Sequence, residues 1–212
     1  MTAARRRGLL PRERDDHYVR LKDAQVVATR ALLEVRENIR TAIAAQAMIC
    51  IYGATGHGKS LAVNASLREL APDVTRRIHF QARPTTRGLR HYLRYLWDDP
   101  DTGLTIVFTG GDGCFKTLQS EPMLESRVYT WQEIPRMPPT EVLTVIPAFH
   151  PLWADADPGL ISLCDQEAAH GNFRAWAKIT HQLLGGMETT SRTAVDEEIL
   201  RWVYSKLPRQ GT

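Results

Sequence analysis

Residues 53–60 of this 212-residue chain spell GATGHGKS, which fits the pattern G-x-x-x-x-G-K-S/T. Glycines let successive backbone N–H groups turn toward an anion, and the start of a following helix adds positive partial charge. The lysine of this pattern pairs with the outer phosphates of a nucleotide, and the hydroxyl ligates Mg²⁺. We therefore expect ATP and Mg²⁺ to bind here, with Ser60 as the metal ligand. The expected nucleotide-contacting set is Gly53, Ala54, Thr55, Gly56, His57, Gly58, Lys59, Ser60 and Leu61.

The elements around this motif are those that a phosphate-binding loop requires. Residues 48–52 (MICIY) form a continuous apolar run without alternation, which is typical of a strand buried on both faces of a parallel sheet. A helix is expected over residues 59–70, ended by Ala71-Pro72. A strand, a glycine-rich loop and a helix in this order are the context that supports the phosphate-binding interpretation of the motif.

Further elements are predicted on both sides of the motif. Apolar residues recur at helical spacing over residues 24–45 and indicate an amphipathic helix. A second helix carries Leu89, Leu93 and Leu96 on one face, begins near Thr85 or Thr86, and stops at Pro100. Strands are expected over residues 76–80, 104–109 and 128–131, the second being closed by Gly110–Gly113.

The chain becomes helical in pattern after Pro138-Pro139. Thr140, Asn172 and Thr193 are the expected helix caps, and Gly185-Gly186 is the expected stop of one helix. The predicted fold class is α/β, with a parallel sheet flanked by helices and a C-terminal helical lid. We divide the chain into a flexible basic arm (1–23), a nucleotide-binding core (24–137) and the helical subdomain (138–212).

Composition excludes several classes of protein. The net charge is only +3, which permits contact with nucleic acid without arguing for it. Cys50, Cys114 and Cys164 lie far apart without a C-x-x-C pair, which speaks against a disulfide framework or a structural zinc site. No apolar run approaches the length of a membrane span or a signal-peptide core. We expect a cytoplasmic protein with no membrane partner.

Four stretches together make residues 24–184 resemble the AAA+ ATPases that assist DNA transposition, the TniB-like and TnsC-like family, which is related to the type II secretion ATPase. The first is the phosphate-binding loop. Residues 105–112 resemble the sensor 1 strand, residues 122–127 (PMLESR) the segment that carries an arginine finger, and residues 171–174 (GNFR) sensor 2. The helical part of the chain resembles the AAA+ lid.

The resemblance implies roles for residues outside the loop. Thr109 or Asp112 would face the γ-phosphate, Arg127 would reach a neighbouring subunit's nucleotide, and Arg174 would lie on the phosphates. It also implies an AAA+-type oligomer with a transposase and DNA as partners.

One expected part of such a protein is missing from the sequence. An AAA+ core has an apolar strand that ends in a pair of acids, which hold magnesium and activate water. Between residues 59 and 104 the only acidic pair is Asp98-Asp99, and the spacing of the leucines before it favours a helix over a strand. We therefore expect a sheet that is one strand short and a protein that binds ATP but hydrolyses it poorly. Two alternatives remain: an ATPase that uses Asp98 or Asp99, and another P-loop nucleotide-binding module.

Overall fold

A computed structural model of the chain describes residues 19, 21–70, 87–192 and 194–207. The chain forms two compact units. The sheet unit holds Arg30–Thr55 and Lys59–Pro135. The helical unit holds the described residues before Arg30, together with Gly56–Gly58 and the chain from Arg136 onward.

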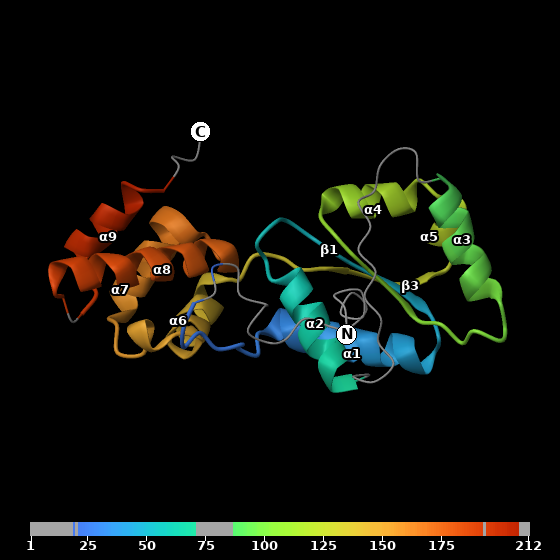
Figure 1. The fold of residues 1–212 in the computed structure, drawn as a ribbon, viewed down its shortest axis with the longest axis horizontal. Helices are drawn as coiled ribbons and strands as arrows, with labels where there is room; N and C mark the ends of the chain where they lie inside the picture. Colours follow the sequence, from blue (N-terminus) through green and yellow to red (C-terminus); the bar gives the residue numbers. More distant parts are fainter. Residues whose placement is uncertain (1–18, 20, 71–86, 193, 208–212) are drawn as a thin grey trace, which may run out of the picture. The chain divides into compact units, whose positions relative to one another are not determined.

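The sheet has three parallel strands among the described residues, in the order β2-β1-β3 (Figure 1). They are β1 (Met48–Tyr52), β2 (Ile106–Thr109) and β3 (Val128–Glu133). The predicted strands over 48–52, 104–109 and 128–131 are confirmed, although β2 begins two residues later and β3 runs two residues further than expected. The α/β class with a parallel sheet flanked by helices is confirmed as well.

The side chains of β1 alternate between two apolar clusters, because successive residues of a strand point to opposite faces. Ile49 and Ile51 pack with α1 (Arg30–Ala44) and α2 (Lys59–Leu70). Met48 and Cys50 pack on the other face with α4 (Asp112–Gln119) and α5 (Pro122–Glu125). Figure 1 shows α1 and α2 side by side on one face of the sheet and α4 on the other. Burial on both faces explains why the sequence of β1 is apolar without alternation.

The helical unit packs around two tryptophans. Its helices are α6 (Pro139–Phe149), α7 (Pro158–Cys164), α8 (Phe173–Thr190) and α9 (Glu197–Tyr204). A 3-10 turn (Pro151–Trp153) follows α6, and a wide helical turn (Asp165–Ala169) follows α7. Trp153 and Trp176 are fully buried, with ring centroids 5.1 Å apart at an interplanar angle of 89°. Edge-to-face contact of this kind is the favoured arrangement of aromatic rings.

Several predicted element boundaries are wrong. The helix expected from residue 24 begins at Arg30, because Val27 packs against the apolar clusters of the helical unit instead. Residues 112–119 form α4, whereas only a glycine turn was expected there. Leu21, near the end of the predicted basic arm, is buried with Phe149 in the helical unit.

The helical part needs corrections too. The predicted stop at Gly185-Gly186 is wrong, because α8 continues to Thr190 and ends at Ser191 in the left-handed conformation. Helix α6 begins after Pro138 rather than at a Thr140 cap, with Pro139 in its first turn. The cap expected at Asn172 is confirmed: its side chain accepts hydrogen bonds from two backbone N–H groups of α8.

Other predictions fall partly or wholly outside the described residues. The strand over 76–80 and the caps at Thr85, Thr86 and Thr193 all do so. The helical interpretation of the segment before Asp99 is confirmed, since α3 spans Arg87–Asp98.

Candidate nucleotide-binding site

The predicted loop leaves the sheet at the carboxyl end of β1 through a buried glycine. Gly53 has φ +137°, in the region that favours glycine. A Cβ at this position would lie 2.5 Å from the carbonyl oxygen of Ile134, the residue after β3. The backbone N–H of Ile134 in turn donates to the carbonyl of Tyr52 (2.8 Å). The start of the loop is therefore fixed against the segment that follows β3, and no residue larger than glycine fits there.

The middle of the loop contacts the segment that resembles sensor 2. Gly56 has φ +89°, and a Cβ there would lie 2.3 Å from the side-chain oxygen of Asn172. The backbone N–H of Arg174 donates to the carbonyl of Gly56 (3.2 Å). The side chain of Arg174 is exposed, and Phe173 lies next to Gly58, so residues 172–174 border this part of the loop.

The end of the loop is the start of α2. The Lys59 ammonium donates to the carbonyl of Ala54 (2.7 Å), which holds the lysine side chain over the loop. Ser60, Ala54 and Thr55 are exposed, and the remaining loop residues after Gly53 are half-buried, as is Leu61. The first turn of α2 carries no acidic side chain, so the positive end of its dipole is not neutralised from within the helix.

These observations fit a bound nucleoside triphosphate with Mg²⁺. The loop has glycines in backbone conformations that other residues rarely adopt, a lysine held over it, and an exposed serine hydroxyl at a helix N-terminus. A phosphate group requires these donors, and Mg²⁺ accepts a serine oxygen as a ligand. Among the described residues, no group of three or more histidine, cysteine or acidic side chains forms a metal cage of its own.

Polar residues at the end of β2 and at the start of α4 lie near the end of the sheet that carries the loop. Thr109 is exposed and pairs in register with Ile51, two residues before Gly53. Asp112, the alternative sensor residue, is exposed in the first turn of α4. The sheet therefore brings both predicted sensor positions to the end of β1 that carries the loop.

Sequence reasoning missed a third polar residue at this edge. Glu133 ends β3, is exposed, and pairs in register with Tyr52. Burial raises the pKa of Tyr52, and the negative charges of Glu133 and Asp112 raise it further. Two carboxylates thus flank the last residue of β1. The acidic end of an otherwise ordinary strand was the available signal, but it gained meaning only from the register of β3 against β1.

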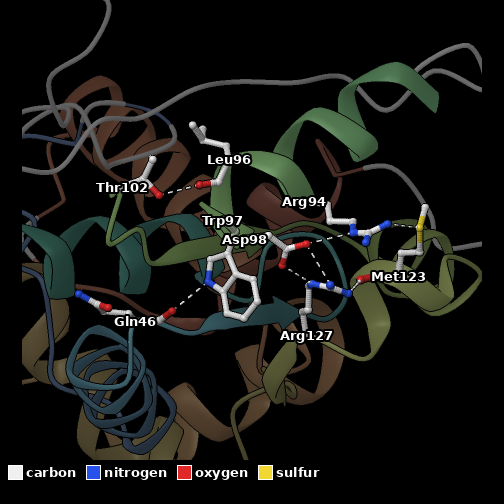
Figure 2. A network of polar contacts seen from close by, with 8 residues as sticks. All are labelled: Gln46, Arg94, Leu96, Trp97, Asp98, Thr102, Met123 and Arg127. Atoms are coloured by element: carbon white, nitrogen blue, oxygen red, sulfur yellow. Dashed lines mark hydrogen bonds and ion pairs between the residues drawn. The ribbon is translucent and has the colours of Figure 1, made fainter. Parts of the chain in front are cut away.

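Arg127, the candidate arginine finger, lies at the opposite end of the sheet, where the strands begin. It precedes Val128, which pairs with Met48 at the first position of β1, whereas the loop follows the last. Figure 2 shows its guanidinium held by Asp98 at the end of α3. Nε donates to Oδ1 (2.8 Å), Nη2 donates to Oδ2 (3.0 Å), and Nη1 donates to the carbonyl of Met123 (2.7 Å).

The surroundings of Asp98 complete a polar cluster that we call the Arg127 clamp: Arg94, Trp97, Asp98, Met123 and Arg127. Arg94 donates to Asp98 (3.1 Å), and the Arg127 guanidinium lies 5.9 Å from the centre of the Trp97 ring. Trp97 Nε1 donates to the carbonyl of Gln46, just before β1. The Arg127 guanidinium, followed by that of Arg94, lowers the pKa of the Asp98 carboxyl.

The position of the Arg127 clamp shows where Asp98 and Asp99, the two possible substitutes for the catalytic acid, lie. Asp98 reaches Arg127 and, through Trp97, the residue before β1, so it lies at the edge of the sheet away from the loop. Asp99 follows it and accepts a hydrogen bond from the N–H of Asp101. A five-residue strand is about 16 Å long, so neither carboxylate reaches the loop of its own chain. The hypothesis that Asp98 or Asp99 replaces the missing acid is therefore disfavoured.

The turn before Asn172 is held by a buried carboxylate. Asp165, which is 6 % exposed, accepts hydrogen bonds from the N–H of Gly171 (2.8 Å) and from Trp176 Nε1 (3.1 Å). A Cβ at Gly171 would lie 2.2 Å from the carbonyl oxygen of Met137. Asp165 thus fixes the turn that leads into Asn172 and Arg174.

Comparison with known proteins shows which solved structures have a similar fold. No protein-family model and no curated protein sequence matches the chain. Among solved structures, it is similar to RuvB, the Holliday junction branch migration motor of Thermotoga maritima, at 14% identity and TM-score 0.59 over 82% of this chain and 69% of that one. It is also similar to the ORC2 protein of Aeropyrum pernix, whose structure holds ADPNP and ADP. The identity is 13% and the TM-score 0.62 over 84% of this chain and 68% of that one.

A third similar structure is domain III of the replication initiation protein DnaA from Thermotoga maritima, at 11% identity and TM-score 0.59 over 88% of this chain and 95% of that domain. The chain has an AAA+ P-loop NTPase fold. In the described part of the chain, no helix has the length and apolarity to cross a membrane.

Proposed function

We propose that this chain is an ATP-binding AAA+-type regulator of DNA transposition that binds nucleotide at residues 53–61. The observation that carries the proposal is the P-loop: left-handed glycines after a central strand, then Lys59 and Ser60 opening α2. The chain shares its fold with RuvB and with ORC2, whose structure holds ADPNP and ADP, which supports a nucleotide as the ligand.

We assign the following roles to the chain's own groups. Backbone N–H groups of the loop and the start of α2 bind the phosphates, and Lys59 exchanges its bond to Ala54 for a phosphate oxygen. Ser60 would hold Mg²⁺, which would neutralise phosphate charge. Thr109 lies at the edge where the γ-phosphate would be sensed. Arg174 lies beside the middle of the loop, as a sensor 2 arginine would.

Arg127 would act between subunits. The register of β3 puts it at the far end of the sheet from the P-loop of its own chain, so in this proposal Arg127 would meet the nucleotide of a neighbouring copy. Self-association would then require either that the hydrogen bonds between Arg127 and Asp98 break, or that Arg127 and Asp98 move together toward the neighbouring subunit. The transposase and DNA partners rest on the order of motifs along the chain, in which PMLESR follows the sensor 1 strand and precedes GNFR.

A working ATPase is the second candidate, and the carboxylates of Asp112 and Glu133 favour it. Both are exposed at the P-loop edge, where a carboxylate that activates water must lie. The sequence predicts that the usual acidic pair after an apolar strand is missing, so our first expectation remains slow or absent hydrolysis. Turnover lost in Glu133→Gln or Asp112→Asn would assign the acid.

The test measures ATP binding and phosphate release on the same preparation. We expect Lys59→Ala to lose most of the ATP affinity, because the lysine is the charged side chain of the cradle, and Lys206→Ala to retain it. Binding that depends on Lys59 without phosphate release supports a nucleotide-gated binder. Equal affinity in the wild type and Lys59→Ala would overturn the assignment of the site.

The partners need a separate experiment. We expect ATP to promote self-association, measured by light scattering on a sizing column, and Arg127→Ala to weaken it. Binding to duplex DNA should fall as salt rises, since phosphate contacts release counterions. Salt-insensitive or absent DNA binding would remove DNA from the proposal while leaving nucleotide binding intact.

A further inference from the structure

Two of the three cysteines meet inside the sheet unit. Cys50 is fully buried on β1, and Cys114 is half-buried in the first turn of α4. The two belong to the same apolar cluster on one face of the sheet. The first turn of α4 lies on the face of β1 that carries Cys50, and the interaction between the two thiols shifts the pKa of both.

The backbone holds Cys114 over the sheet. Its N–H donates to the carbonyl of Gly111 (2.9 Å). A Cβ at Gly110 would lie 2.4 Å from the Cβ of Cys114, which shows how closely the first turn of α4 sits on the end of β2. Phe115 stacks on Tyr52, with ring centroids 4.2 Å apart, and fixes the same turn against β1. Cys114 therefore stays beside Cys50.

The two thiols differ in reactivity. The hydrogen bond from Cys50 lowers the pKa of Cys114, and the N-terminus of a helix favours a thiolate in the same way. The same bond, together with burial, raises the pKa of Cys50. Cys114 is also the more exposed of the pair, so an oxidant meets the better nucleophile first.

We propose that Cys50 and Cys114 are a thiol modification site that a peroxide converts into a reversible disulfide. The Cys114 thiolate attacks one peroxide oxygen, which forms a sulfenic acid and releases hydroxide, or the corresponding alcohol after protonation. The sulfur of Cys50 then attacks the Cys114 sulfur, its proton leaves with the hydroxyl group, and water is released. Two thiols and one peroxide give one disulfide, one alcohol or water, and one water.

A disulfide here would join the P-loop strand to the helix that follows β2. Gly111 lies just before α4, and a Cβ at Gly111 would be 4.0 Å from the carbonyl oxygen of Gly53. The bond would thus fix the first turn of α4 against the start of the P-loop. An effect on ATP affinity rests on the proposed function, whereas formation of the bond does not.

Peptide mapping of the full chain tests the bond directly. The reduced protein is treated with hydrogen peroxide, alkylated and digested without reductant. We expect a linked Cys50–Cys114 peptide that disappears on addition of dithiothreitol. Cys164 should remain alkylatable after unfolding, because it is buried in the core of the helical unit and burial raises its pKa to about 12. Absence of the linked peptide, or pairing of Cys164 instead, would overturn the proposal.

A variant separates the two roles. In Cys50→Ser the second step is lost, so Cys114 should stop at the sulfenic acid, which dimedone traps as a stable adduct. Cys164→Ser is the matched control and should form the disulfide as the wild type does. An unlabelled Cys114 in Cys50→Ser would refute its role as the attacking thiol. None of these measurements involves nucleotide, so failure of ATP binding and failure of this proposal are distinguishable.

Discussion

Replacement of Asp165 by alanine should strongly destabilise the helical unit. The carboxylate is 6 % exposed and accepts hydrogen bonds from the buried N–H of Gly171 and from Nε1 of the fully buried Trp176. Alanine would leave both donors without an acceptor, and each unpaired buried donor costs about 1–3 kcal/mol. We expect a loss of about 2–6 kcal/mol for the pair, which corresponds to a fall in the unfolding midpoint of roughly 5–20 °C.

Two variants show whether the lost hydrogen bonds cause the effect. Asp165→Asn keeps an acceptor oxygen and should cost less than half as much as Asp165→Ala. Asp157 also accepts from two backbone N–H groups but is exposed, so Asp157→Ala should cost only about 1 kcal/mol, as an ordinary cap does. Calorimetric unfolding measures all three. Equal losses in Asp165→Ala and Asp165→Asn would refute the reasoning.

Two further predictions concern single sites. A Cβ at Gly185 would meet open space, so Gly185→Ala should stabilise α8 by about 0.5–1 kcal/mol. A Cβ at Gly186 would lie 2.8 Å from the Trp202 ring, so Gly186→Ala should destabilise the helix. Changes of the same sign in the free energy of unfolding in urea for both variants would contradict this. Arg127 lowers the pKa of Asp98, so the clamp should stabilise fully above about pH 4 and lose its effect as the pH falls through the lower folded value. The gap in unfolding midpoint between wild type and Asp98→Asn should therefore close in acid, and a gap that widens there would exclude this pairing.

The sequence was most informative where a long pattern and a motif coincide. The apolar run of β1 next to the glycine-rich loop predicted the strand, the loop and α2 with their observed bounds. Burial of β1 on both faces is what removes the polar alternation, so the pattern and the structure have one physical cause.

Glycines caused the largest errors of secondary structure. Gly110, Gly111 and Gly113 around Asp112 are typical of a turn, yet α4 begins at that aspartate and runs on to Gln119. Gly185 and Gly186 lie inside α8, because tertiary packing offsets the modest helix penalty of each glycine.

The polar pairs could not be predicted, because they depend on register. Glu133 gains its place beside the P-loop only when β3 is aligned with β1. Asp98 and Arg127 are far apart in sequence and meet through the packing of α3 next to the segment before β3. Neither residue type nor spacing along the chain carries that information.

The distribution of indole side chains makes the two units spectroscopically different. Trp153 and Trp176 are fully buried in the helical unit, whereas Trp97 and Trp131 of the sheet unit are only half-buried. Indoles shielded from water emit at shorter wavelength than those in contact with it. The blue side of the emission band therefore reports the helical unit and the red side carries the sheet unit together with the exposed Trp202. Because Trp202 belongs to the helical unit, only the blue side of the band is specific to one unit. Loss of the blue emission can thus follow the unfolding of the helical unit without an added label.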